Sequence, residues 1–119
     1  MEQDASHVVT DSRRADWNRA IHATRAFDTG LRLFLEKFSH RSANSHSISD
    51  YVNDLQRNIT STTGFTQLSG ATATRIINEV VYKRNLYCHS AGAFPTHGEA
   101  DYLIDRILEY YLIVLGLEK

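Results

Sequence analysis

The sequence predicts an all-α protein, an up-and-down bundle of four to five helices, and three observations support this. Apolar side chains recur every three or four residues along several segments, which is the period of an amphipathic helix. No segment alternates apolar and polar residues as a strand would. The single proline, Pro95, leaves the helices before it unbroken. At 119 residues, we expect one domain over 11–118 after a flexible N-terminus at 1–10.

The first predicted helix spans about residues 11–38, and a polar loop follows at 39–47. Gly30 should weaken this helix without ending it. The residues that share its inward side are Trp17, Ala20, Ile21, Thr24, Leu31, Leu35 and Phe38, widened by Phe27 and Phe34. The loop histidines His40 and His46 have no cysteine or carboxylate at ligand spacing. We therefore expect a solvated connector there rather than a metal site or a substrate-binding rim.

A short second helix is predicted over about 48–58, and a loop rich in threonine, serine and glycine over 60–71. Ser47 or Ser49 can cap the helix, and Asp50 favours its positive end. The two glycines of the loop are not spaced as in a phosphate-binding loop, so no nucleotide site is predicted. The apolar loop residues expected to pack back onto the bundle are Phe65 and Leu68.

A third helix is predicted over about 72–90 and a last helix over about 99–117. An ideal helical period gives the third helix one face with Ile77, Val80, Val81, Arg84 and Cys88, and another with Asn78, Tyr82, Asn85 and His89. The last helix has two apolar faces, Leu103, Ile107, Tyr110, Val114 and Leu117, and Ile104, Leu108, Tyr111 and Leu115. Two such faces indicate a central helix, or one that also packs on another chain.

Composition limits the classes of partner. A formal charge of -1 gives no overall attraction for nucleic acid, so RNA binding needs a local basic patch or a cleft made by two chains. One cysteine, Cys88, excludes an internal disulfide and favours a reducing compartment, so we expect a cytoplasmic protein. The sequence begins without the pattern of a secretion signal and has no apolar run of membrane-spanning length. No membrane partner is expected.

Arg84, Asn85 and His89 stand out in the string RNLYCH near the end of the third helix. Arginine is a permanent cation whose planar donors match phosphate oxygens, and histidine exchanges a proton near neutral pH. Residues five apart point about 140° from each other on an ideal helix. Arg84 and His89 of one straight helix therefore cannot meet at one phosphate. Either the helix ends early, with Gly92 nearby, or two chains each supply part of the site.

The arginine, the polar residue directly after it and the histidine five positions on resemble the signature of the HEPN family. The resemblance covers most of the chain as a helical domain of about the right length, and it is specific only in this stretch. It implies a homodimer whose two arginine–histidine pairs line one cleft. It also implies a ribonuclease without metal or other cofactor. In that reaction the 2′-hydroxyl of the RNA attacks the adjacent phosphate, leaving a cyclic phosphate and a 5′-hydroxyl.

The resemblance also implies roles for the three motif residues. His89 would act as general acid or base, Arg84 would hold the scissile phosphate, and Asn85 would position His89 or the ribose. Other roles fit the residues alone. Arg84 can instead form a structural ion pair with Asp105 or Glu109, and His89 can simply favour the C-terminal end of a helix dipole.

Four neighbouring residues are candidates for substrate binding. Tyr82 and Tyr87 can stack on bases, although packing explains both, and Lys83 and Arg75 can add phosphate contacts, although ordinary surface charge explains them too. In HEPN toxins paired with a nucleotidyltransferase antitoxin, a modified tyrosine usually follows two residues after the histidine. Here that position is Ala91, so control by that route is not expected. Another control, by a different antitoxin or a sensor protein, or a different branch of the HEPN family, fits the sequence better.

The expected function is therefore a metal-independent endoribonuclease of the toxin or antiviral-defence type, acting on RNA as a homodimer. Two alternatives remain. One is a non-catalytic HEPN-like dimerisation or adaptor module that binds RNA, a nucleotide or a partner protein. The other is a helical bundle in which the R-x4-H spacing is accidental.

Overall fold

A computed structural model describes residues 2–38, 45–59, 64–90 and 92–118, with the side chains of the first helix described from Arg13 onward. Its regular elements are helices: α1 (Glu2–Lys37), α2 (Ile48–Arg57), α3 (Gly70–Arg75), the π-helical segment η2 (Ile76–Val81), α4 (Tyr82–His89) and α5 (His97–Leu115). These residues contain no strand, only an isolated bridge between Phe65 and Glu118. The all-α prediction is confirmed. Within the described part of the chain, no helix has both the length and the apolar character to cross a membrane.

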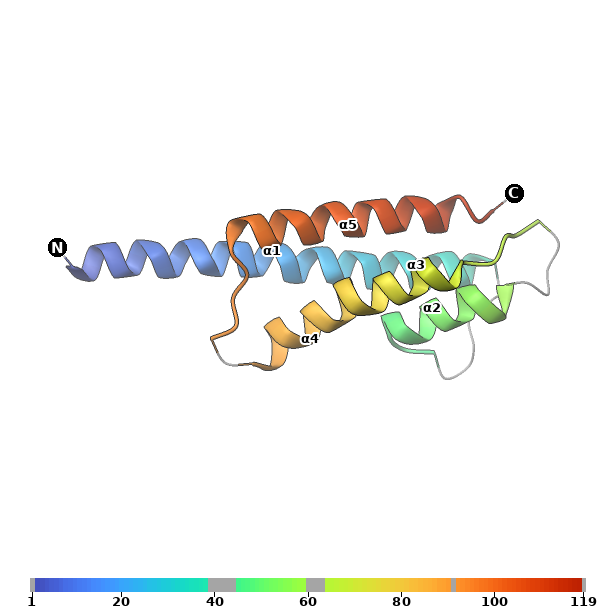
Figure 1. Cartoon of the computed structure of the whole chain (residues 1–119), viewed down its shortest axis with the longest axis horizontal. Coiled ribbons are helices and arrows are strands. Elements are labelled where there is room, and N and C mark those ends of the chain that lie inside the picture. Colours follow the sequence, from blue (N-terminus) through green and yellow to red (C-terminus); the bar gives the residue numbers. More distant parts are fainter. Residues whose placement is uncertain (1, 39–44, 60–63, 91, 119) are drawn as a thin grey trace.

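The segments α3, η2 and α4 follow one another without a break and form one rod, called the α3–α4 rod below. Figure 1 shows α1, α2 and α5 running in one direction and the rod in the opposite one, and the rod contacts both α1 and α5. The bundle is therefore not strictly up-and-down, because α2 runs parallel to α1. The connection between them is ten residues long, which spans up to roughly 33 Å, while the ten-residue α2 is about 15 Å long. The chain thus has enough length to return before α2 begins.

Helix α1 begins at Glu2, well before the predicted start near residue 11. No glycine or proline lies among its first ten residues, so no strong helix breaker opposes the earlier start. Figure 1 shows the N-terminal part of α1 extending beyond the other helices, and the molecule measures 64 × 24 × 22 Å. The flexibility expected for residues 1–10 stays a prediction.

The predicted inward faces of α1 and α5 form the core. The residues predicted for the first apolar face of the last helix are all buried, namely Leu103, Ile107, Tyr110 and Val114 in α5 and Leu117 just after it. Its second predicted face divides: Ile104 and Tyr111 are half-buried, whereas Leu108 and Leu115 are exposed. Tyr111 packs edge-on against Phe27 of α1 with ring centroids 6.4 Å apart. Only part of the second apolar face therefore packs against other residues of the chain.

The cap predicted for α2 and the two apolar loop residues are where the sequence placed them, and α5 begins with a capping box that was not predicted. Ser47 accepts a hydrogen bond from the backbone N–H of Asp50, at the start of α2. Thr96 and Glu99 form a reciprocal capping box at the start of α5. Leu68 is buried, with its N–H donating to the carbonyl of Leu55, and Phe65 packs edge-on against Phe34 and Phe38.

Gly30 lies where α1 and α5 touch. A Cβ at this position would lie 2.7 Å from Cε1 of Tyr111, which is too close without movement of that ring. At Gly98 in the first turn of α5, a Cβ would meet no atom within 4 Å. Both glycines are helical, so only the local contact distinguishes them.

We predict that Gly98→Ala stabilises the protein by roughly 0.4–1 kcal/mol, because alanine reduces the entropy of the unfolded chain. Gly30→Ala should show no such gain, because the added methyl group displaces Tyr111. Chemical denaturation of both variants measures the free energy of unfolding. Equal stabilisation by the two substitutions would contradict the assigned contact.

Candidate functional site

The α3–α4 rod carries the motif residues and has an unusual middle. Ser69 caps its start by accepting the N–H of Thr72, and in η2 the N–H of Tyr82 donates to the carbonyl of Ile77, five residues back. The residues of the rod that are buried before and after this turn keep a helical spacing, namely Ala73, Ile76, Val80 and Tyr87. Cys88, predicted to share a face with Val80, is exposed. The buried face of the rod is therefore centred on Val80 and Tyr87, and Cys88 lies outside it.

Arg84 is half-buried and makes no hydrogen bond or ion pair with a described residue. Its two expected structural partners are on α5. Glu109 pairs with Arg106 at 2.5 Å, and Asp105 makes no ion pair with a described residue. Neither carboxylate therefore pairs with Arg84.

Asn85 and His89 are exposed one helical turn apart, so they lie on the same side of α4. Tyr82 continues this outer face and is 62% exposed. Helix α4 runs through His89 and is capped at Ser90, and the left-handed Gly92 (φ 77°) comes only after it. The helix does not end between Arg84 and His89. The structure thus places Asn85 and His89 on the same side of α4, whereas Arg84 of the same chain lies on a different side of the helix.

The other predicted substrate-binding residues are dispersed. Tyr87 is buried, its carbonyl accepts a hydrogen bond from Nε1 of Trp17 at 2.9 Å, and burial raises the pKa of its hydroxyl. Lys83 is half-buried and turned toward α5, and Arg75 is exposed at the far end of the rod, at the close of α3. Of these residues, only Tyr82 shares the outer face of α4 with Asn85 and His89.

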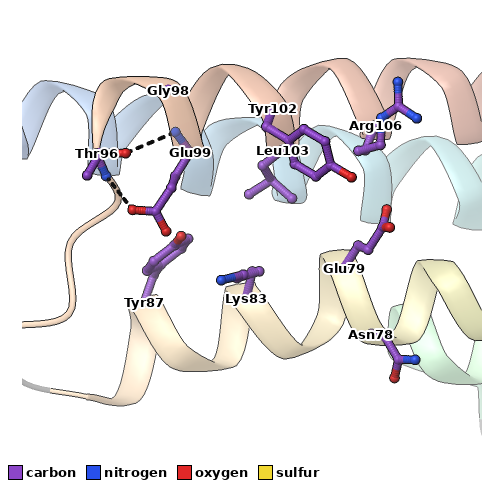
Figure 2. Close-up of a pocket in the computed structure, with 10 residues that line it drawn as sticks. All are labelled: Asn78, Glu79, Lys83, Tyr87, Thr96, Gly98, Glu99, Tyr102, Leu103 and Arg106. Atoms are coloured by element: carbon purple, nitrogen blue, oxygen red, sulfur yellow. Dashed lines mark hydrogen bonds between the residues drawn. The ribbon is translucent and has the colours of Figure 1, made fainter.

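A cleft of about 490 Å³ lies between the rod and α5. The side chains lining it are Asn78, Glu79, Lys83, Tyr87, Thr96, Gly98, Glu99, Tyr102, Leu103 and Arg106. Figure 2 shows Glu79, Lys83 and Tyr87 pointing from the rod toward α5, while Asn78 points away. The motif residues Arg84, Asn85 and His89 do not line this cleft.

The charges of the cleft are largely engaged within the protein. The Glu79 carboxylate accepts a hydrogen bond from the hydroxyl of Tyr110, and burial together with this carboxylate raises the pKa of Tyr110. The backbone N–H of Thr96 lowers the pKa of Glu99, and the nearby charge of Lys83 lowers it further. The sequence already places Glu79, Lys83 and Tyr87 four residues apart on one face. The packing of this face against α5 depends on the tertiary fold. The sequence pattern therefore did not predict the cleft.

A second set of polar side chains joins α1 to α5. We call Asp16, Arg19, His97 and Asp101 the α1–α5 polar cluster. Asp16 is buried and contacts Nδ1 of His97 at 2.9 Å and Nη1 of Arg19 at 3.0 Å. Nη2 of Arg19 also lies 2.5 Å from Asp101. The hydrogen bonds from His97 and then Arg19 lower the pKa of Asp16, and the bond from Arg19 lowers that of Asp101. The cluster holds the two helices in register.

The described residues contain no group of three histidine, cysteine, aspartate or glutamate side chains arranged to bind a metal ion. His40 lies outside the described residues, as do residues 60–63 and Ala91. At the start of α2, the backbone N–H of His46 donates to the carboxylate of Asp50 and lowers its pKa.

Comparisons of the chain with protein-family models, with curated proteins and with solved structures find no match. The candidate site therefore depends on the residues and their geometry.

The polar cluster predicts a loss of stability in acid. Carboxyl groups whose pKa is lower in the folded state bind more protons when unfolded, so their stabilisation is present above the unfolded pKa and lost below it. We expect the free energy of unfolding to fall between about pH 5 and pH 2, and Asp16→Asn to reduce this pH dependence. Urea unfolding across this range measures the effect, with Asp28→Asn as the matched control. Identical pH profiles for the two variants would rule out a linking role for Asp16.

Proposed function

We propose that the chain is a metal-independent endoribonuclease of the HEPN type, cutting RNA in a site that two copies build together. The observation that carries the proposal is the state of Arg84. It is a half-buried permanent cation without a partner among the described residues, directly before the exposed Asn85. Leaving a half-buried charge unpaired costs free energy, so a functional anion is the reasonable partner.

The helical geometry supports a site made by two chains. On a continuous α-helix, Arg84 and His89 point about 140° apart and cannot both contact one phosphate. A two-fold axis beside the outer face of α4 would bring a second copy of the motif opposite the first. His89 of one chain would then face Arg84 of the other. This arrangement also concentrates positive charge locally, which a chain of formal charge -1 otherwise lacks.

The residues suit an attack of the RNA 2′-hydroxyl on its own phosphate. His89 would accept the proton of the 2′-hydroxyl or donate a proton to the leaving 5′-oxygen, and its exposed position makes it accessible to RNA. Arg84 would offset the negative charge that grows on the phosphate. Asn85, one turn before His89, would orient the imidazole or a ribose hydroxyl. The exposed ring of Tyr82 offers a stacking surface for a base.

Three of the residues predicted to bind substrate, Lys83, Arg75 and Tyr87, lie outside the proposed site. Lys83 faces the cleft and Arg75 lies nine positions before Arg84, so neither belongs to the outer face of α4. Tyr87 supports the rod by packing beneath it. The proposed partners are RNA, a second copy of the chain and an antitoxin or sensor protein, and the proposed compartment is the cytoplasm.

A non-catalytic adaptor is the second candidate, and the surface of α5 favours it. Four large apolar side chains in the second half of this helix are exposed: Leu108, Leu112, Ile113 and Leu115. Such clustering on a helix often marks a protein-binding surface. An adaptor would bind RNA, a nucleotide or a partner protein without cutting RNA.

We predict that the purified protein cleaves mixed RNA in the presence of a chelator, and that His89→Ala lowers the rate by at least 100-fold, as expected for loss of an acid–base group. The products should carry 2′,3′-cyclic phosphate and 5′-hydroxyl ends. His22→Ala is the matched control, because His22 is an exposed histidine of α1 outside the motif, and it should leave the rate unchanged. Absence of cleavage at micromolar protein would instead favour the adaptor.

A further inference from the structure

The outer surface between α1 and α5 has a regular register. Arg19 contacts Asp101, and both helices run in the same direction with an offset of 82 positions at this pair. Seven residues further along each helix, the same offset places Ala26 level with Leu108. Seven more place Leu33 level with Leu115. Residues seven apart lie on nearly the same side of a helix, so all of these positions face outward along one line.

This line is charged at one end and apolar at the other. We call Ala26, Leu33, Leu108, Leu112 and Leu115 the leucine seam. Its leucines are all exposed: Leu33 by 54%, Leu108 by 58%, Leu112 by 68% and Leu115 by 43%. Within the chain these side chains gain little from folding, because water still covers about half of each one. A row of exposed leucines across two neighbouring helices indicates a binding surface.

We infer that the leucine seam binds a second copy of this chain, with the two copies side by side and their α1 and α5 helices all parallel. A two-fold axis along the seam places α1 of one copy opposite α5 of the other at the same level. The apolar ends then meet each other. Arg19 of each copy also lies opposite Asp101 of the other, and these side chains are 42% and 48% exposed and accessible for this contact. In an antiparallel arrangement the charged end would face the leucines, which is unfavourable.

Charges along the edges of the seam select the same arrangement. Arg25 lies on the edge of α1 that is away from α5, and Asp105 lies on the edge of α5 that is away from α1. Both are exposed and differ by 80 positions, close to the offset of 82. In the parallel arrangement, Arg25 of one copy approaches Asp105 of the other. In the antiparallel arrangement, edges of like charge would meet instead.

The seam is distinct from the interface that the proposed ribonuclease requires. Leu112 follows Leu103 by nine residues, which places them about 180° apart around α5. Leu103 lines the cleft that faces the α3–α4 rod, so Leu112 points away from the rod. The inference therefore goes beyond the proposed function and does not depend on it. With both interfaces, the chain would assemble beyond a dimer.

The test is the mass of the assembly in solution, measured by light scattering after size-exclusion chromatography at several concentrations. Leu112→Glu should halve the mass of the wild-type assembly, because it places a charge within the apolar end of the seam, while circular dichroism shows the same helix content. Asn53→Glu, on the exposed surface of α2 and outside both proposed interfaces, is the matched control and should leave the mass unchanged. A wild-type monomer at all concentrations, or an unchanged mass for Leu112→Glu, would overturn the inference.

Disulfide trapping tests whether the two copies bind each other in the parallel arrangement. In a Cys88→Ser background, chains carrying Ala26→Cys are mixed with chains carrying Leu108→Cys under mild oxidation. The parallel arrangement predicts a cross-linked pair made of one chain of each kind. An assembly that keeps the wild-type mass but forms no such cross-linked pair would overturn the parallel arrangement. The cross-linking result does not depend on whether the protein cleaves RNA.

Discussion

The parallel packing of α1 against α5 is the contact on which the rest of the fold depends. Gly30 lets the ring of Tyr111 reach α1, where it meets Phe27 edge-on, and the α1–α5 polar cluster fixes the register at one end. The α3–α4 rod then packs against both helices, and Trp17 of α1 donates a hydrogen bond to the carbonyl of Tyr87. The outer face of α4 is left exposed as a consequence.

The position of the motif on α4 limits what one chain can do. Arg84 is half-buried and His89 is exposed at the last turn of a continuous helix, so the two side chains diverge. A phosphate bound by Arg84 is therefore beyond the reach of His89 in the same chain. Acid–base chemistry needs its groups within hydrogen-bond reach of the reacting atoms. The proposed chemistry thus depends on assembly, and a monomer would keep the motif inactive.

The amphipathic period of the sequence predicted which residues fill the core, because the burial of residues such as Tyr110 follows from helical geometry alone. The capping box of Thr96 and Glu99 was not predicted, although it needs only neighbours in sequence and T-x-x-E before an apolar run is a local signal for it. The π-helical turn before Arg84 could not be predicted, because nothing in the local sequence distinguishes it from an α-helical turn. The direction of α2 and the cleft around Glu79 depend on how whole helices pack, which the sequence pattern does not encode locally.

In the proposed ribonuclease, one active site takes its arginine and its histidine from different chains. Mixing inactive Arg84→Ala chains with inactive His89→Ala chains, after exchange of subunits, tests it directly. Half of the dimers would contain one chain of each kind, and each of these would keep one intact site, so about a quarter of the wild-type RNA cleavage should return. Cleavage that stays absent in the mixture, with both variants folded and mixed dimers present, would contradict the shared site.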